Sequence, residues 1–224
     1  MKRDEWLKER RKGIGGSECA AVLGLSRYRS ALSVYLDKIG EGFEVEENER
    51  MSWGLKLERL ILEEYGNRTG YHVKHNCSQD VMCHKDHDFF ICTPDGWATH
   101  PTKGLGIIEC KNVDKWSSDE WKDGHVPDEY LLQLQHNLGV TGLAWGVLCA
   151  LIGGNQFIYQ EFDRDDDLIH LIVEKEAAFW NNHVLTHEPP DPSGASLEVL
   201  SKMYPQDSGK SITLYDDAIG KAIT

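Results

Sequence analysis

Hydrophobic side chains in the first third of the chain recur with the spacing of helices. Residues 51–68 carry apolar or aromatic side chains near every 3.6 positions, which predicts an amphipathic helix closed by Gly70. Residues 4–11 also fit a helix. Serine caps predict two shorter helices, which run from Ser17 through Leu23 and from Ser30 to Gly40.

The pattern changes to strands in the middle of the chain. Residues 71–111 form short strand-like runs between clusters of turn residues, as in a meander or a set of hairpins. A helix is predicted at 127–139, two strands at 143–152 and 156–162, and a long helix at 165–186 that prolines terminate.

This order of helices, strands, helix, strands and helix indicates the fold class. It is typical of an α/β fold with a mixed central β-sheet flanked by helices. We therefore expect a single domain at residues 1–205 and a loosely attached C-terminal tail at 206–224.

The composition is that of an ordinary globular domain. Of 224 residues, 40% are hydrophobic and 27% are charged, and the mean hydropathy is −0.47. No apolar run reaches the roughly 18 residues that a membrane helix needs, and the charged start lacks the apolar core of a signal peptide. Because no export signal is recognised, we expect a cytoplasmic protein whose six cysteines are reduced thiols. The sequence contains no Cys-x-x-Cys pair.

Charge is distributed unevenly. The net charge is −13, yet residues 1–38 carry nine Lys and Arg against five Asp and Glu. The acidic total argues against a surface that adheres loosely to nucleic acid. A localised anion site at the basic end is compatible with the pattern, as is a simple solvated helix.

Three side chains that could bind a metal ion or take part in catalysis are expected to converge at the end of one predicted strand. Because strand residues alternate faces, Glu109 and Lys111 point the same way, and a hairpin can return Asp95 beside Glu109. Two carboxylates about 4 Å apart repel by roughly 4 kcal/mol at an effective dielectric of about 20, so they need a cation. Lys111 is one, and unsatisfied carboxylate oxygens are ligands that Mg²⁺ or Mn²⁺ prefers. This set suits metal-assisted phosphodiester hydrolysis.

The same residues also have a plainer explanation. Glu109 and Lys111 can form a salt bridge at a sheet edge, with Asp95 as a turn residue after Pro94. An Asp…Glu-x-Lys pattern is frequent by chance, so the surrounding sequence has to distinguish the two interpretations.

Four short motifs follow one another over more than half of the chain. They are Arg-x-Gly-Ile-Gly-Gly-Ser-Glu at 11–18, Trp-Gly-x-x-x-Glu at 53–58, Pro-Asp…Glu-x-Lys at 94–111 and Tyr-x-x-Gln-x-Gln at 130–135. In this order they resemble the YqaJ-type viral recombinase exonucleases, the family typified by phage lambda exonuclease. That family belongs to the Pro-Asp…Asp/Glu-x-Lys nuclease superfamily, so the resemblance implies a restriction-endonuclease-like fold.

The resemblance implies how the strand motif would work. Asp95 and Glu109 would bind Mg²⁺, for which Mn²⁺ can substitute, and the backbone carbonyl of Cys110 would be a further ligand. Lys111 would act on the attacking water.

Two further catalytic positions follow from the resemblance. Glu58 matches the helical carboxylate of the family site, and Gln133 matches the first glutamine of the Tyr-x-x-Gln motif, near the lysine. From the residues alone, Glu58 can also be a surface partner of Arg59 or Lys56.

The glycine-rich motif suggests an anion site. Glycines and a serine at a helix start expose backbone N–H groups and a hydroxyl, and an arginine can add a bidentate charge. The resemblance implies that Arg11 and Ser17 bind a terminal 5′-phosphate, with Arg10 as the candidate if the register differs by one. Alternatively, Ser17 is an ordinary N-cap.

Two other groups are weighed against simpler explanations. The histidines and cysteines between residues 72 and 87 match no standard zinc-site spacing and are typical of a hairpin. Trp116 and Trp121 can stack on DNA bases or pack a helix against the sheet.

The resemblance finally implies a function. The protein would be a metal-dependent 5′–3′ exonuclease that digests one strand of linear double-stranded DNA from 5′-phosphorylated ends and leaves a 3′ single strand for recombination by annealing. It would act as a homotrimer in a phage-infected or prophage-bearing bacterial cell, with a phage single-strand annealing protein as partner. A restriction-like endonuclease and a non-catalytic DNA-end binding module remain as alternatives.

Overall fold

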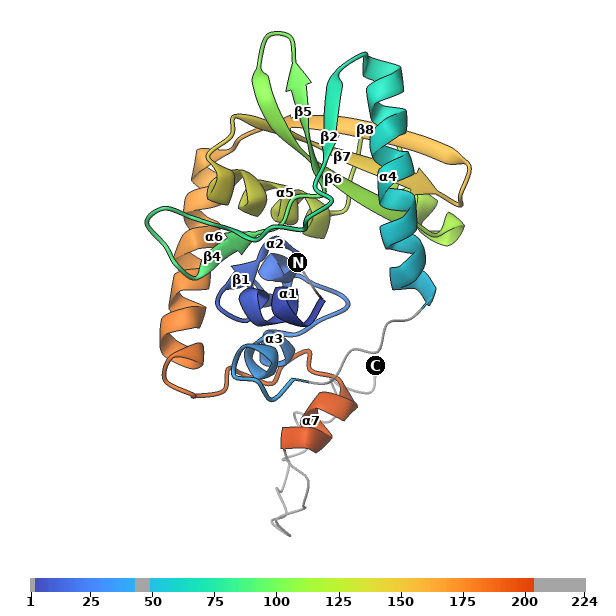
Figure 1. Cartoon of the computed structure of the whole chain (residues 1–224). Coiled ribbons are helices and arrows are strands. Elements are labelled where there is room, and N and C mark those ends of the chain that lie inside the picture. The colour runs from blue at the N-terminus through green and yellow to red at the C-terminus, as the bar shows by residue number, and fades with distance from the viewer. Residues whose placement is uncertain (1–2, 43–48, 204–224) are drawn as a thin grey trace.

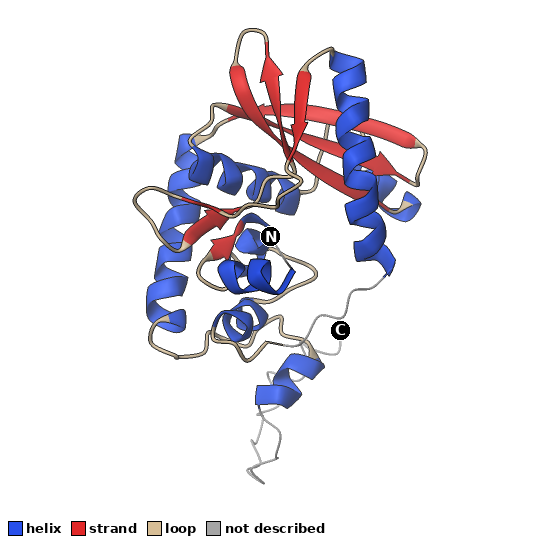
Figure 2. Cartoon of the chain, viewed as in Figure 1, coloured by secondary structure: helices blue, strands red, loops and turns tan. Residues whose placement is uncertain are grey.

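The structure is a computed structural model, which describes residues 3–42 and 49–203 (Figures 1 and 2). The helices are α1 (Arg3–Arg10), α2 (Gly16–Val22), α3 (Ala31–Lys38), α4 (Glu49–Thr69), α5 (Asp128–Thr141), α6 (Asp166–Phe179) and α7 (Leu197–Met203), with a 3₁₀ helix η1 (Lys115–Trp121) and a π-helical turn η2 (Trp180–Val184). The strands are β1 (Ile14–Gly15), β2 (His72–His75), β3 (Met82–Cys83), β4 (Phe90–Cys92), β5 (Gly96–His100), β6 (Gly104–Val113), β7 (Trp145–Ile152) and β8 (Gln156–Asp163). The expected domain end at 205 and the tail at 206–224 lie outside the described residues.

Five strands form the central sheet in the order β2-β5-β6-β7-β8. Strands β6 and β7 run parallel, and each other neighbouring pair in this sheet is antiparallel. The parallel pair requires a long crossover, which η1 and α5 supply. A smaller sheet, β1-β4-β3, lies beside it. The predicted α/β class with a mixed central sheet is confirmed.

Helices cover both faces of the central sheet (Figure 2). Along β6, Ile107 packs with Leu134 of α5, whereas the next residue, Ile108, packs with Ile61 of α4. This alternation is the two-residue period of a strand. It directs Glu109, like Ile107, to the face that α5 covers.

The predicted amphipathic helix is present as α4. Ile61, Leu62 and Tyr65 are buried against the sheet, whereas Trp53 and Leu60 of the same periodic set are exposed. No helix in the described part of the chain is long and apolar enough to cross a bilayer.

The two serine caps have different outcomes. Ser30 caps α3 as predicted, because its hydroxyl accepts a hydrogen bond from the backbone N–H three residues later. Ser17 lies inside α2, so its prediction as the cap is wrong. Gly15 takes that position, its N–H donates to the Glu18 carboxylate, and the Ser17 hydroxyl accepts from Arg10 instead.

The N-terminal helices lie beyond α5 on the side away from the sheet, with α2 nearest to α5 (Figure 1). Helix α2 packs mainly against α5 and also touches α6. This packing brings the glycine-rich segment close to the C-terminal half of β6, which carries the predicted site residues Glu109 and Lys111.

Candidate active site

The hairpin between β5 and β6 brings Asp95 to the motif on β6. Gly96 pairs with Ile108, so Asp95, one residue earlier, stands opposite Glu109. The Asp95 Oδ2 atom accepts a hydrogen bond of 2.7 Å from the backbone N–H of Cys110. Since β5 begins only at Gly96, the edge of β6 beyond Ile108 is available to side chains.

Glu109 is buried and is held by three side chains. Its Oε1 accepts hydrogen bonds from Lys111 Nζ at 2.9 Å and from the Gln133 amide, and its Oε2 accepts one of 3.2 Å from Asn137 Nδ2. Gln133 and Asn137 lie one helical turn apart on α5, so the same helix face orients the carboxylate.

Lys111 stands between the sheet and α5. Its Nζ also donates to Gln133 Oε1 at 2.8 Å and lies 4.8 Å from the centre of the Tyr130 ring. Burial by itself would lower the pKa of Lys111, but Glu109 and Asp95 more than offset this and raise it. Lys111 is therefore protonated, and its hydrogen bonds to Glu109 and Gln133 fix the orientation of its ammonium group.

Glu58 of α4 points toward the same group of side chains. Its Oε1 lies 2.7 Å from His75 Nε2, and burial raises its pKa, with Glu109 adding to the effect and His75 opposing it. The alternative of a surface pair with Arg59 is wrong, because Arg59 pairs with Glu63.

One cavity of about 610 Å³ joins these groups to the glycine-rich segment. Arg10 and Ser17 line it, and Arg10 Nη2 donates to Ser17 Oγ at 2.8 Å. Arg11 does not line it: its guanidinium lies 3.5 Å from the carboxylate of Asp37. Arg10 is the last residue of α1, and successive helix positions point about 100° apart, so the side chains of Arg10 and Arg11 leave the helix end in different directions.

The donor set fits a hard divalent cation. Burial raises the pKa of Asp95 well above its ordinary value, and Glu109 and Glu58 raise it further, so the carboxyl groups lie close enough to oppose one another's ionisation. The Cys110 carbonyl points to the same open edge as its N–H, because both groups of a strand residue face one side. Carboxylate and carbonyl oxygens are the ligands of Mg²⁺ and Mn²⁺.

The sequence did not reveal some residues of this site. Asn76 is buried; its Nδ2 donates to the Pro94 carbonyl and its backbone N–H to the Asp95 carbonyl, both at 2.9 Å, so it fixes the loop that carries Asp95. Asn137 has a sequence signal, because it lies four residues after Gln133 on the predicted helix. Asn76 lies between predicted strands and has no such signal.

The remaining candidates lie outside the cavity. Trp121 is buried and stacks on Tyr130 with ring centroids 5.5 Å apart, so for this indole the packing alternative describes the structure. Trp116 is 96% exposed. Among the histidines and cysteines of residues 72–87, His75 binds Glu58, and His84 stacks on His87. Among the described residues of this segment, no three side chains place metal-ligand atoms close together.

Comparison with known proteins identifies the family. The sequence model of the YqaJ-like viral recombinase domain matches residues 5–144. The chain belongs to this family. It is 36% identical over 220 residues to the uncharacterized protein YqaJ of Bacillus subtilis (strain 168), covering 96% of this chain and 67% of that one. It is 27% identical over 151 residues to the uncharacterized protein R354 of Acanthamoeba polyphaga mimivirus, covering 63% and 27%.

Solved structures share the fold. An alkaline exonuclease from Laribacter hongkongensis superposes with a TM-score of 0.68 at 24% identity, covering 83% of this chain and 94% of that one. The same exonuclease in complex with dAMP gives 0.68 at 23% identity, covering 89% and 97%. A phage-related exonuclease from Haemophilus somnus 129PT gives 0.59 at 14% identity, covering 78% and 95%. The family member described here thus has the restriction-endonuclease-like fold, and its family and fold are consistent with a nuclease.

Proposed function

We propose that this protein is a divalent-metal-dependent exonuclease that digests one strand of linear double-stranded DNA, 5′ to 3′, from a 5′-phosphorylated end. Mononucleotides are released and a 3′ single strand remains for recombination by annealing. The observation that carries the proposal is that Asp95, Glu109 and Lys111 share one cavity with Arg10 and Ser17. Its volume, about 610 Å³, suits a nucleotide-sized ligand.

The strand motif would perform the hydrolysis. Asp95, Glu109 and the Cys110 carbonyl would hold Mg²⁺, or Mn²⁺ as a substitute; when bound, such an ion polarises the phosphodiester and acidifies water. The Lys111 ammonium already donates to Glu109 and Gln133. Its third hydrogen would orient the attacking water or stabilise the negative charge that develops on the phosphoryl oxygens.

The opposite wall would bind the end of the strand. The Arg10 guanidinium is planar and can donate two parallel hydrogen bonds to a phosphate, and the Ser17 hydroxyl that it now contacts can donate a third. With the terminal phosphate fixed there, one particular phosphodiester lies at the carboxylates. Digestion from the end, one nucleotide at a time, follows from this arrangement.

The relatives support the substrate class. A similar exonuclease has been solved with dAMP, which is a mononucleotide of the kind this reaction releases. The proposal includes the homotrimer, the phage single-strand annealing partner and the bacterial cytoplasm as its setting, all on the strength of family membership. The exposed Trp116 is a proposed base-stacking contact, whereas the packed Trp121 is not.

Two alternative functions use the same cavity differently. A restriction-like endonuclease would cut covalently closed circular DNA, which has no end to bind. A DNA-end binding module would retain the duplex end without cleaving it in Mg²⁺. The pairing of a phosphate-binding wall with the carboxylates favours an exonuclease over both.

The proposed polarity is tested by digestion of linear duplexes that carry a label on one strand, with either a 5′-phosphate or a 5′-hydroxyl. Arg10→Gln should lower the preference for phosphorylated ends by about 10-fold or more, since a hydrogen bond to a charged group contributes about 1.5–3 kcal/mol. Arg11→Gln is the matched control, because Arg11 pairs with Asp37 outside the cavity.

The outcomes separate the alternatives. We expect labelled mononucleotides from the 5′ end of linear duplex and intact closed circles. Equal digestion of both kinds of end by the intact protein would refute the phosphate pocket, and linearised circles would indicate an endonuclease. Loss of end preference in Arg11→Gln but not in Arg10→Gln would contradict the assignment of the cavity wall.

A further inference from the structure

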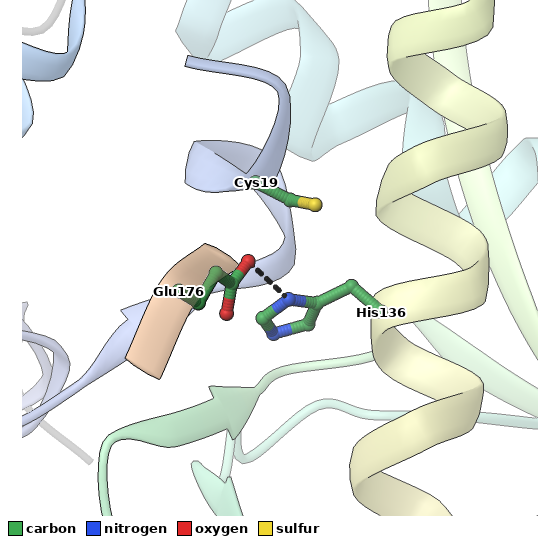
Figure 3. A group of neighbouring side chains, drawn as sticks. All are labelled: Cys19, His136 and Glu176. Atoms are coloured by element: carbon green, nitrogen blue, oxygen red, sulfur yellow. Dashed lines mark hydrogen bonds and ion pairs between the residues drawn. The ribbon is translucent and has the colours of Figure 1, made fainter. Parts of the chain in front are cut away.

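A second group of polar side chains lies in the core, separate from the cavity. Cys19 of α2, His136 of α5 and Glu176 of α6 each contribute one ligand atom, and these atoms lie within 4.8 Å of one another. All three side chains are fully buried. Figure 3 shows them approaching from the three helices. Among the residues that the structure describes, no other group of this kind occurs.

The hydrogen bonds of His136 leave one ring nitrogen with an unusual neighbour. Its Nε2 lies 2.8 Å from the Ile91 carbonyl, which can only accept, so Nε2 carries a hydrogen. In the neutral ring, Nδ1 then has a lone pair, and it lies 3.0 Å from Glu176 Oε1 (Figure 3). Two acceptors at this distance require a positive species between them, either a proton or a metal ion.

A shared proton satisfies only part of the group. The second carboxylate oxygen of Glu176, Oε2, is buried and has no hydrogen-bond partner. An unpaired buried acceptor costs about 1–3 kcal/mol, and more when it is charged. A proton shared between His136 Nδ1 and Glu176 Oε1 leaves this second oxygen without a partner, whereas a metal ion bound by the group could contact both oxygens.

We propose that Cys19 Sγ, His136 Nδ1 and the Glu176 carboxylate form a structural zinc site. Sulfur, imidazole nitrogen and carboxylate oxygen are the donors that Zn²⁺ takes in proteins, and both oxygens of Glu176 would complete four. A thiolate and a carboxylate together neutralise the two charges of the ion, so the filled site would place no net charge in the core. The hydrogen bond from Nε2 to Ile91 is the outer contact that metal-binding histidines commonly make.

The site would stabilise the framework of the cavity without taking part in its chemistry. Helix α5 carries Gln133 and Asn137 toward Glu109, and on another face it carries His136. Helix α2 carries Ser17 as well as Cys19. A zinc ion would join α2, α5 and α6 at one point, and this holds whether or not the protein is a nuclease.

The test is cobalt substitution in the full-length protein. Protein refolded with one equivalent of Co²⁺ should show the charge-transfer absorption of a thiolate–cobalt bond, and protein purified from zinc-containing medium should retain about one Zn²⁺ per chain after dialysis against excess Mg²⁺. Cys19→Ala should remove the band and the zinc. Cys149→Ala, which changes another buried cysteine on the opposite face of the sheet, should keep both.

Two results would overturn the site. One is an intact protein that gives no thiolate–cobalt band and retains no zinc; this is decisive even if Cys19→Ala fails to fold. The other is a band of full intensity in Cys19→Ala, which would assign the metal to another thiol. Because the oxygen donors of Asp95 and Glu109 cannot produce the band, failure here leaves the nuclease proposal unaffected.

Discussion

The position of Asp95 that suits metal binding also lowers the stability of the fold. Its backbone carbonyl is bound by Asn76, and its carboxylate is placed beside Glu109 and Glu58 with Lys111 as the nearby cation. Burial and the two carboxylates raise its pKa well above the ordinary value of 3.8. A group with a raised folded-state pKa lowers the free energy of unfolding as the pH rises through the interval between the two values. At neutral pH, the Asp95 carboxyl group therefore lowers the free energy of unfolding.

Asp95→Asn should consequently make the metal-free protein more stable while abolishing cleavage. We expect a gain of about 1 kcal/mol or more at neutral pH, since each pKa unit corresponds to about 1.4 kcal/mol, and the amide oxygen can still accept from Cys110. Denaturant unfolding with and without Mg²⁺ measures this. Mg²⁺ should stabilise the intact protein and not the variant. A less stable variant, or equal stabilisation of both by Mg²⁺, would contradict the metal role of Asp95.

The residues at this scale were predictable where a periodic pattern or a motif existed. The two-residue period of β6 predicts correctly that Glu109 and Lys111 share a face, and the motif order leads to Gln133, which the structure brings to Lys111. Arg10 and Arg11 differ by one helix position, and the sequence contains nothing that fixes the rotation of α1. Asn76 is bound to a loop 18 residues away, a contact that only the fold defines.

Elements were predicted better than their ends. The strands of the central sheet, α4 and α5 occur where the periodicity places them, because each buries apolar side chains. The start of α2 differs because Glu18, not Ser17, receives the first free N–H. In β6, a Cβ at Gly106 would lie 2.3 Å from the Trp145 ring, so this glycine makes room for an indole that follows 39 residues later. Local sequence patterns do not predict contacts between residues so far apart in the chain.

The buried pair of Glu18 and Lys38 connects α2 to α3. The Nζ and Oε2 atoms are 2.7 Å apart, and Lys38 also donates to the Arg10 carbonyl at 2.9 Å, so the pair supports the arginine of the cavity. Although burial opposes ionisation of Glu18, Lys38, Arg10 and Arg29 lower its pKa from 4.5 to about 2. This corresponds to roughly 3 kcal/mol, part of which the burial of Lys38 offsets.

Glu18→Gln should therefore lower the free energy of unfolding at pH 7 by about 3 kcal/mol, because it leaves a buried ammonium without its counterion. The depressed pKa means that the contribution is complete above pH 4.5 and is lost as the pH falls toward 2. The variant should lack this acid dependence. Glu9→Gln, which breaks only an exposed pair with Lys12, should cost less than about 1 kcal/mol. Equal losses in the two variants would contradict the prediction.

In the whole molecule, the central sheet brings together motifs that lie far apart in the sequence. Strand β6 bears Glu109 and Lys111, and α4 and α5 pack on its opposite faces (Figure 1). Residues of α1 and α2 complete the lining of the cavity. The net charge of −13 would repel polyanionic DNA from most of the surface and favour contact at the side of the cavity that carries Arg10. Fold class and family could be inferred from sequence; the shape of the cavity required the structure.

The most direct test of the central claim measures the rate of mononucleotide release from 5′-phosphorylated linear duplex in saturating Mg²⁺ by the intact protein and by Lys111→Met. Lys103→Met, at an exposed pair with Asp163 remote from the cavity, is the control. We predict that Lys111→Met loses about 100-fold or more in kcat while it still binds duplex ends, and that Lys103→Met cleaves like the intact protein. Undiminished release by Lys111→Met would contradict the account.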